Sequence, residues 1–422
     1  MASELTGASS ERVYFDNAAT SFPKPASVVR AMTDYATRLG ASPGRGAYRE
    51  AQESAQILSR CREAIRKLLN ARSAEHVIFT LNTTDALNLA IKGLLLPRLA
   101  TGESVHVVTT AMDHNSVLRP LNALISQFDG LLTQTIVEAD SQTGLVDPEA
   151  VRRAIRPDTR LVAVVHASNV TGSLQPIAAI GAVCRAMAVP LLVDAAQSAG
   201  HIPVDMQGMN IDLLAAPGHK GLLGPLGTGV LVMRPGMERM IHTTREGGTG
   251  SISEQPIHPL EMPDKYESGS HNTMGIAGLL AGVEYLLERG MDDLARHERE
   301  LSEQFLRGIH DSSGHLLPGL RLLGPPGVAD RVGVFAVTVD GMSPLELAQE
   351  LESRFGVLTR PGLHCAPHAH ETMRTDPESV GAEMAGACRF SLGPFLSVQD
   401  VKYATDALAQ ICEEQAAKAA TV

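Results

Sequence analysis

Two residues near the middle of the chain could do chemistry together, an aspartate and a lysine. Asp194 ends the apolar run 191–193, and Lys220 stands in the glycine-rich run 218–221. A lysine amine that has lost its proton can bond covalently to a carbonyl carbon. A buried carboxylate can keep a ring nitrogen protonated through a charge-assisted hydrogen bond. These are the amine and the acid that pyridoxal phosphate needs, provided that the surroundings lower the pKa of the lysine.

Further polar residues accompany this pair in the sequence. Thr83 and Thr84 open an expected helix, where free backbone N–H groups favour a phosphate. His114 is placed to stack on a ring or pass protons, and Gln197 could bond a ring hydroxyl. Each residue alone has an ordinary alternative: a capping hydroxyl, a core histidine, a paired aspartate or a surface lysine. Their joint occurrence in this order favours a cofactor site.

The elements that must position these residues alternate regularly along the first part of the chain. The patterns predict strands at 77–80, 105–108, 161–165, 191–194, 213–216 and 229–233, and helices at 85–96, 115–126 and 177–187. This order predicts an α/β fold, with a mostly parallel sheet covered by helices on both faces. Ligands of such sheets bind beyond the carboxyl ends of the strands, which is where the candidate residues lie.

The pattern changes after a glycine-rich stretch at 246–251. Long helices are expected at 274–289 and 293–311, followed by strands 332–339 and 389–392, helix 344–354 and a final helix opened by the capping box Ser397–Asp400. We therefore expect a smaller α+β domain and a main boundary near 265 to 290. The division that we predict is a flexible N-terminus (1–12), a segment packing on the small domain (13–30), a large cofactor-binding domain (31–270) and the small domain (271–422).

Composition narrows the class of protein. The chain has 422 residues, 44% hydrophobic and 20% charged, which is typical of a globular protein with large cores. A net charge of -11 without a basic cluster argues against nucleic acid as a partner. No run of eighteen apolar residues and no signal-like N-terminus is present, so we expect no membrane span and a cytoplasmic protein. Five cysteines without CxxC spacing indicate neither a disulfide framework nor a metal site.

Six motifs make the chain resemble the class V aminotransferase family, and more narrowly its cysteine desulfurase and selenocysteine lyase branch. They are Tyr14–Thr20, Asn82–Asn88, Asp113–Ser116, His166–Asn169, Asp194–Gln197 and Gly218–Lys220. The resemblance covers about residues 13 to 410. It implies a fold-type-I pyridoxal phosphate-dependent transferase, whose large domain has a mostly parallel seven-stranded sheet.

The resemblance also implies a role for each candidate residue. Lys220 would bond the cofactor aldehyde, and Asp194 would pair with the pyridine nitrogen. His114 would stack on the ring, and Gln197 and Asn169 would contact the ring oxygen or substrate. The phosphate would be held by Thr83, Thr84 and His219. Family members are homodimers in which a Gly-Thr-Pro-Asn run of one subunit reaches the other's cofactor. Here Ser270 keeps the hydroxyl of that run, although His271 replaces its proline.

The run Arg360–Ala366 bears on the reaction, because it resembles the cysteine-bearing loop of the desulfurases. In that reaction Lys220 removes the α-proton of L-cysteine, and the Cys365 thiolate takes the sulfur as a persulfide and leaves L-alanine. A glycine- and proline-rich loop with Arg360 and His364 nearby could give a thiolate an accessible, electropositive setting. A buried, inert cysteine is the alternative, and we expect Cys61, Cys184 and Cys412 to be of that kind. A sulfur-acceptor protein is a possible partner.

The substrate side of the site is expected at Asn17, Arg45, Asn169, Arg360 and Arg389, of which Arg389 matches the arginine that binds the substrate α-carboxylate. Three positions depart from the family: Pro217 replaces a hydroxyl residue near the phosphate, Leu396 replaces an asparagine, and Ala47-Tyr48 stands where a histidine is common.

The alternatives to a cysteine desulfurase are a selenocysteine lyase, a C–S or sulfoxide lyase, an aminotransferase or epimerase of one pathway, or a non-catalytic scaffold that kept the fold. The intact Lys220 and Asp194 argue against the scaffold.

Overall fold

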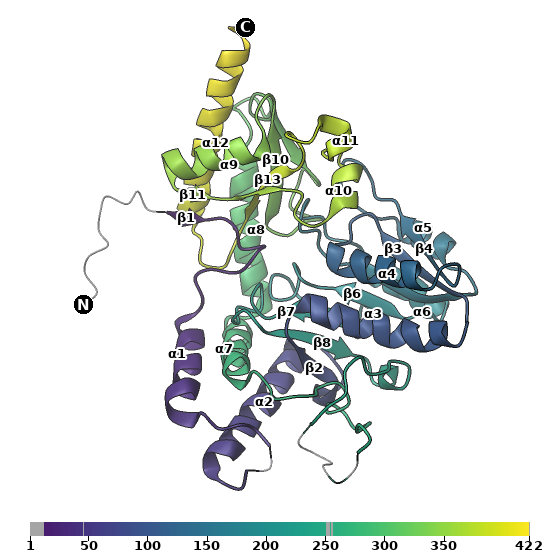
Figure 1. Cartoon of the computed structure of the whole chain (residues 1–422). Helices are drawn as coiled ribbons and strands as arrows, with labels where there is room; N and C mark the ends of the chain where they lie inside the picture. Colours follow the sequence, from purple (N-terminus) through teal and green to yellow (C-terminus); the bar gives the residue numbers. More distant parts are fainter. Residues whose placement is uncertain (1–11, 45, 250–253, 255, 422) are drawn as a thin grey trace.

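A seven-stranded sheet forms the centre of the large domain in the computed structural model, which describes residues 12–44, 46–249, 254 and 256–421 (Figure 1). Its strands, in order across the sheet, are β2 (Val77–Thr80), β8 (Gly229–Met233), β7 (Leu213–Pro217), β6 (Leu191–Asp194), β5 (Thr159–Val165), β3 (Val105–Thr110) and β4 (Leu132–Val137). Strand β8 runs antiparallel to both its neighbours, and the other neighbouring pairs are parallel. The mostly parallel seven-stranded sheet expected from the sequence is confirmed.

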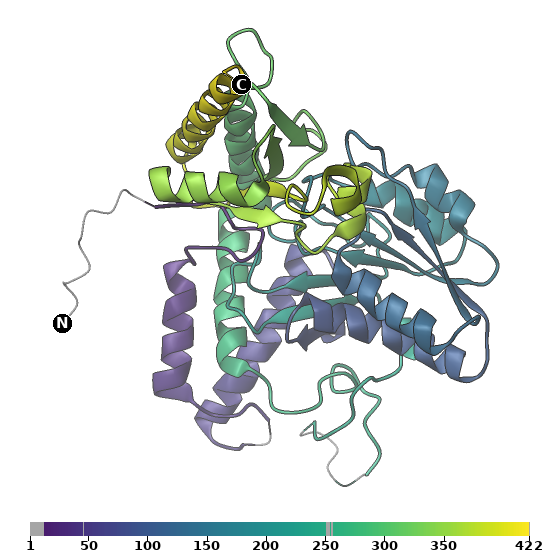
Figure 2. The same cartoon turned by 45° about the horizontal axis from the view of Figure 1, so that its top comes forward.

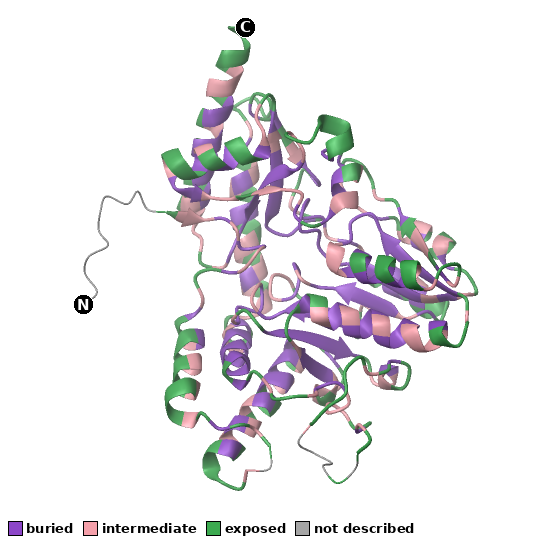
Figure 3. Cartoon of the chain, viewed as in Figure 1, coloured by how far each residue is buried: buried purple, intermediate pink, exposed green. Residues whose placement is uncertain are grey.

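Helices cover both faces of this sheet (Figures 1 and 2). Helices α3 (Thr83–Ala100) and α4 (Asn115–Gln127) pack on one face. The other face is covered by α2 (Arg49–Leu68), α5 (Pro148–Ala154), α6 (Ile177–Ala186) and α7 (Thr273–Arg289). Along β6, Leu191 and Val193 belong to one core and Leu192 to the other. Successive side chains of a strand point to opposite faces, so a strand buried on both faces is a continuous apolar run. Figure 3 shows the strands of this sheet largely in the colour of buried residues.

The small domain contains a four-stranded antiparallel sheet in the order β12 (Arg360–Gly362), β13 (Ala387–Ser391), β10 (Val334–Val339) and β9 (Leu320–Leu323). Its helices are α8 (Met291–Gly308), α9 (Pro344–Phe355), α10 (Pro367–Thr372), α11 (Pro377–Val380) and α12 (Val398–Ala419). The expected capping box opens α12. Phe305 stacks on Phe335 with ring centroids 4.2 Å apart at the centre of this domain's core.

The N-terminal segment crosses from one domain to the other. Strand β1 (Val13–Tyr14) pairs with β11 (Val357–Leu358), and Phe15 is fully buried in the small-domain core. Helix α1 (Ala26–Asp34) then packs against α7 in the large domain (Figure 1). Residues 1–11 of the segment expected to be flexible lie outside the described residues.

Helix α7 stands close to the expected domain boundary and belongs to the larger core. Its side chains Ile276, Leu279 and Val283 pack with residues of the large sheet. We therefore propose that the boundary lies between α7 and α8, at the upper end of the interval 265 to 290. In the described part of the chain, no helix combines the length and apolar character that a membrane span needs.

Candidate active site

A cavity lies at the carboxyl ends of β5, β6 and β7, where the sequence places its candidate residues. Eight expected cofactor-binding residues line it: Thr83, Thr84, His114, Asn169, Asp194, Gln197, His219 and Lys220. Asn82, Ser116 and Pro217 are also part of the lining. Residues that lie far apart in the sequence are therefore brought together at one edge of the sheet.

The acid and the amine come from neighbouring parallel strands. Asp194 ends β6, is 3% exposed, and accepts a hydrogen bond from the backbone N–H of Ala196 at 3.0 Å. Burial raises the pKa of Asp194 to about 6, against the lowering effects of that amide and of Lys220. Burial also lowers the pKa of Lys220 to about 8, and the opposing effect of Asp194 does not restore the ordinary value. A substantial share of the amine is therefore neutral near pH 8, as covalent bonding to an aldehyde requires.

His114 is held in one tautomer by the helix that it precedes. Its Nδ1 accepts a hydrogen bond from the backbone N–H of Ser116 at 3.0 Å, which places the ring proton on Nε2. Burial, together with the nearby positive charge of Lys220, lowers the pKa of His114 to about 4. The imidazole is therefore neutral at physiological pH and suits stacking on an aromatic ring.

The turn that carries His114 is fixed by a buried carboxylate. Asp113 accepts hydrogen bonds from the backbone N–H of Thr110 at 2.6 Å and from that of Val165 at 2.7 Å. It therefore joins the ends of β3 and β5 directly beneath the cavity. Burial raises the pKa of Asp113 to about 7. The sequence analysis assigned no role to Asp113, although it lies in one of the six motifs.

Buried polar groups without partners line the cavity, including its end next to helix α3. Asn82 caps this helix by accepting from the backbone N–H of Asp85 at 3.0 Å. Thr83 Oγ1, His219 Nδ1 and Asn169 Oδ1 are buried and have no hydrogen-bond partner among the residues that the structure describes. Buried polar atoms are normally paired, so the three atoms indicate a polar ligand. Pyridoxal phosphate fits this cavity, because the N-terminus of α3 can hold a phosphate, Asp194 can pair with a ring nitrogen and Lys220 can bond an aldehyde.

A hydroxyl close to this end was not assigned from the sequence. Ser116 Oγ lies 2.8 Å from Thr84 Oγ1 and 2.9 Å from His114 Nδ1. Pro217 lines the same cavity without a hydroxyl. Ser116 and Thr84 therefore offer hydroxyl groups where the departure at Pro217 removes one.

The loop that carries Cys365 is tied to the cavity by two hydrogen bonds. The Cys365 carbonyl accepts from the backbone N–H of Asn115 at 2.8 Å, and the His364 carbonyl accepts from Nδ2 of Asn169 at 2.6 Å. His364 and Cys365 both have left-handed backbones, with φ of +51° and +57°. These contacts hold a loop of the small domain against the large-domain segments that carry His114 and Asn169.

Cys365 differs from the other cysteines of the chain in its exposure. All five are within the described residues and free; Cys365 is exposed, and the other four are buried. Burial raises the thiol pKa of Cys184, Cys388 and Cys412 to about 12 and that of Cys61 higher still. Four thiols therefore stay protonated and inaccessible.

Two arginines at the substrate side share one carboxylate. Arg389 is 3% exposed and donates to Asp16 Oδ1 at 2.9 Å and to the Asn169 carbonyl at 3.0 Å, while its Nε has no partner in the described part of the chain. Arg360 lies 3.5 Å from Asp16 Oδ2. The sequence analysis quoted Asp16 only as part of a motif. Because Asp16 lies far from both arginines in the sequence, no local pattern indicated this contact.

The other expected substrate-side residues differ in how far they are available. Asn17 donates to the Ser391 carbonyl at 3.2 Å and accepts from the backbone N–H of Phe22 at 3.2 Å. Its amide thus fastens the N-terminal segment to β13. Arg45 lies outside the described residues.

Ser270 lies apart from the cavity of its own chain, in a hollow that Leu81, Gly227 and Arg245 also line. The segment before it is fixed by Glu267, which is buried and binds Arg62 at 2.5 Å and His271 at 2.6 Å. Glu267 also accepts from the backbone N–H of Phe79 at 2.6 Å. The segment therefore has a defined position at the surface.

The fold and this arrangement define a class: an α/β enzyme of fold type I, the architecture of the pyridoxal phosphate-dependent transferases. The family model for aminotransferase class-V matches residues 13–404, so the chain belongs to the class V aminotransferase family. The resemblance found in the sequence is confirmed.

Relatives and solved structures agree on the branch of the family. The chain is 33% identical to a probable cysteine desulfurase of Methanothermobacter thermautotrophicus, over 88% of this chain and 90% of that protein. It is 34% identical to a probable cysteine desulfurase of Aeropyrum pernix, over 88% and 89% of the two chains. The apo structure of cysteine desulfurase from Thermococcus onnurineus NA1 has a TM-score of 0.85 and 28% identity, covering 96% of this chain and 95% of that one.

Proposed function

We propose that this chain is a pyridoxal phosphate-dependent cysteine desulfurase, which converts L-cysteine to L-alanine and takes the sulfur onto Cys365. The observation that carries the proposal is the pair of hydrogen bonds from Asn115 and Asn169 to the Cys365 loop. They attach an exposed thiol to the cavity that contains Lys220 and Asp194. The similarity to proteins named cysteine desulfurase supports the same reaction.

The cavity has a group for each part of the cofactor. Thr83, Thr84, Ser116 and His219 would hold the phosphate, Asp194 the pyridine nitrogen, Lys220 the aldehyde, Gln197 and Asn169 the ring oxygen, and His114 the ring face. When bound, pyridoxal phosphate supplies an electron sink that makes the α-proton of an amino acid acidic. The Lys220 amine, when it is free and neutral, is the base for that proton.

The remaining residues bind the substrate and accept its sulfur. Arg389 is buried and has a free Nε, which suits it to hold the substrate α-carboxylate. The Cys365 thiolate attacks the substrate sulfur, so that an S–S bond forms while the C–S bond breaks. The carbon is then protonated to give alanine, and Cys365 is left as a persulfide. Because Cys365 is exposed, a sulfur-acceptor protein can reach it.

The test is the turnover of L-cysteine by purified protein and its Cys365→Ala variant. We expect alanine in equal amount to the sulfur released, a persulfide on Cys365 by mass spectrometry, and loss of both in the variant. Cys412→Ala removes a buried thiol and should keep the activity, which makes it the matched control. Pyruvate and ammonia as products, or unchanged alanine production by Cys365→Ala, would overturn the proposal.

We also propose a homodimer with shared active sites, because Ser270 lies on the surface outside the cavity of its own chain. Mixing Lys220→Ala chains with Ser270→Ala chains tests this, once each variant alone is shown to be inactive. In a mixed dimer one site would combine an intact Lys220 with an intact Ser270, so about a quarter of the wild-type activity should return. No recovery in a mixture shown to exchange subunits would contradict a shared site.

A further inference from the structure

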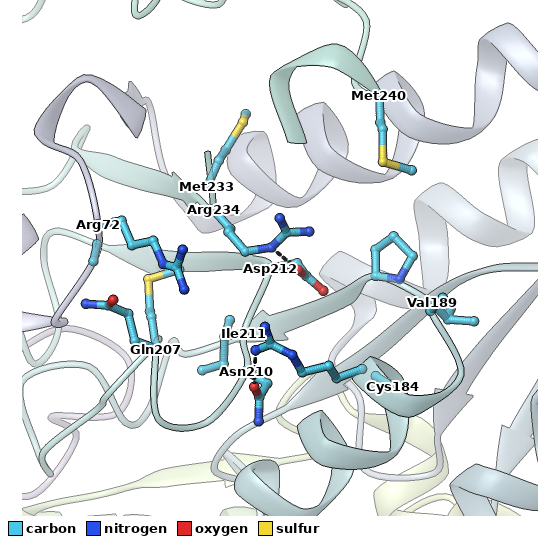
Figure 4. A pocket seen from close by; sticks show the side chains of 15 residues that line it. Arg72, Cys184, Val189, Gln207, Asn210, Ile211, Asp212, Met233, Arg234 and Met240 are labelled. Atoms are coloured by element: carbon cyan, nitrogen blue, oxygen red, sulfur yellow. Dashed lines mark hydrogen bonds and ion pairs between the residues drawn. The ribbon is translucent and has the colours of Figure 1, made fainter. Parts of the chain in front are cut away.

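A second cavity lies at the opposite edge of the large sheet from the candidate active site. It has a volume of about 360 Å³, within the range of small-molecule sites. Its walls come from the segment after α2, from the residues that precede β6 and β7, from the end of β8 and from α6 (Figure 4). None of the expected catalytic or cofactor-binding residues lines it.

Three arginines and one carboxylate give this second cavity its charge. Arg72, Arg185 and Arg234 line it, and Asp212 is the one acidic residue in the lining (Figure 4 labels Arg72, Arg234 and Asp212). Three guanidinium charges against one carboxylate leave two positive charges. This local excess contrasts with the net charge of -11 of the whole chain.

The three guanidinium groups differ in how far they are already paired. Arg234 is tied to Asp212 by a bond of 2.5 Å from Nε to Oδ1. Among the described residues, the Arg185 side chain binds only a neutral group, the side-chain oxygen of Asn210, at 2.5 Å. Arg72 is exposed and makes neither a hydrogen bond nor an ion pair within the described part of the chain. Two cations, Arg72 and Arg185, therefore lack a negatively charged partner beside a formed hollow.

The rest of the lining is largely apolar. Val189, Ile211, Met233 and Met240 contribute side chains, of which Val189, Ile211 and Met233 are buried. Cys184 is also buried there, and its thiol stays protonated because burial raises its pKa to about 12. The cavity thus combines an apolar wall with an unbalanced charge of two, and its three lining methionines, Met206, Met233 and Met240, can adapt to the shape of a ligand.

We propose that this cavity is a second binding site, for a phosphate monoester with an apolar or aromatic body. The two charges of a phosphate dianion match the two unbalanced guanidinium charges. Arginine forks bind phosphate oxygens in a bidentate manner, and the apolar wall would bury the body of the ligand. The site does not depend on the proposed desulfurase reaction.

The cavity is connected to the catalytic residues through two strands. The Asp212 carboxylate accepts a hydrogen bond at 2.9 Å from the backbone N–H of Leu191, the first residue of β6. Asp212 also directly precedes β7 in the sequence. The other ends of these strands carry Asp194 and lead to Lys220. A ligand that binds Arg185 and Arg72 would therefore lie against the starting points of the strands that position the acid and the amine.

The proposal is tested by titrating phenyl phosphate into the cofactor-loaded protein and measuring its binding by calorimetry. The loaded protein is used so that the phosphate end of the catalytic cavity is already occupied. We expect one equivalent to bind and each of Arg72→Gln and Arg185→Gln to weaken binding roughly tenfold or more. Both arginines are exposed, so these variants should fold; circular dichroism checks this.

Arg296→Gln is the matched control, because it removes the same charge from an exposed position on α8. It should leave the affinity unchanged. Benzyl alcohol, which lacks the phosphate, and inorganic phosphate, which lacks the apolar body, should each bind at least about tenfold more weakly than phenyl phosphate. The proposal is overturned if phenyl phosphate does not bind at millimolar concentration, if both lining variants bind it as the wild type does, or if inorganic phosphate binds equally well.

Discussion

The amine of Lys220 should titrate far below an ordinary lysine, even in protein without cofactor. Its pKa is lowered from 10.5 to about 8, chiefly by burial and further by Arg389 and Arg360. At pH 7.5 about a quarter of the Lys220 amines would be neutral, against about one in a thousand for an ordinary lysine. Because a lysine is neutral only after it loses its proton, the neutral fraction of Lys220 increases as the pH rises through 8.

Trace labelling with acetic anhydride measures this titration directly. The modification of the peptide that contains Lys220 is followed by mass spectrometry between pH 6 and 11, relative to a free lysine derivative in the same tube. We expect a midpoint near pH 8. Asp194→Asn removes a charge that raises the pKa, so its midpoint should fall below that of the wild type, and Arg360→Gln should raise it.

A wild-type midpoint at pH 10 or above would refute the reasoning, since burial would then not destabilise the ammonium form. Shifts of the two variants in directions opposite to those stated would show that Asp194 and Arg360 do not act on Lys220 through their charges.

Two further predictions concern packing around the site. Gly229→Ala places a Cβ about 2.6 Å from the backbone of Asn82, the residue that caps α3. We expect a loss of about 1–2 kcal/mol in the free energy of unfolding. We also expect several-fold weaker cofactor binding, measured by absorbance titration. Glu267→Gln leaves the charge of Arg62 buried without its partner, so denaturant unfolding should show a loss of about 3–5 kcal/mol.

Each of these variants has a matched control. Gly248→Ala adds a methyl group where nothing lies within 4 Å, and it should bind the cofactor normally. Glu284→Gln breaks the exposed pair with Arg60, which should cost less than about 1 kcal/mol. Equal effects of a variant and its control would contradict the corresponding prediction.

The central sheet could be predicted because burial on both faces imposes a simple pattern. Strands β5 and β6 each contain a continuous apolar run, and the expected bounds agree with the observed ones within two residues. Strand β4 was not predicted, because it lies at the edge of the sheet and its middle residues Thr133, Gln134 and Thr135 are polar and partly exposed. An edge strand of this kind gives no apolar run to detect.

The candidate site was predictable to the extent that single residues carry chemical meaning. Lys220 and Asp194 have side chains whose chemistry is specific and stand at strand ends. The contacts of Asp16 with two arginines, and of Asn115 with Cys365, join residues far apart in the chain and leave no trace in local spacing. The arginines of the second cavity likewise resemble ordinary surface arginines until the fold brings them together.

The left-handed backbone at His364 and Cys365 has a consequence for protein engineering. Such a conformation costs about 1–2 kcal/mol for each residue that is not glycine. Hydrogen bonds from Asn115 and Asn169, both in the other domain, offset this cost. The peptide alone therefore does not encode the shape of the loop. Transplanting residues 360–367 onto another scaffold would carry the thiol across without the conformation that presents it.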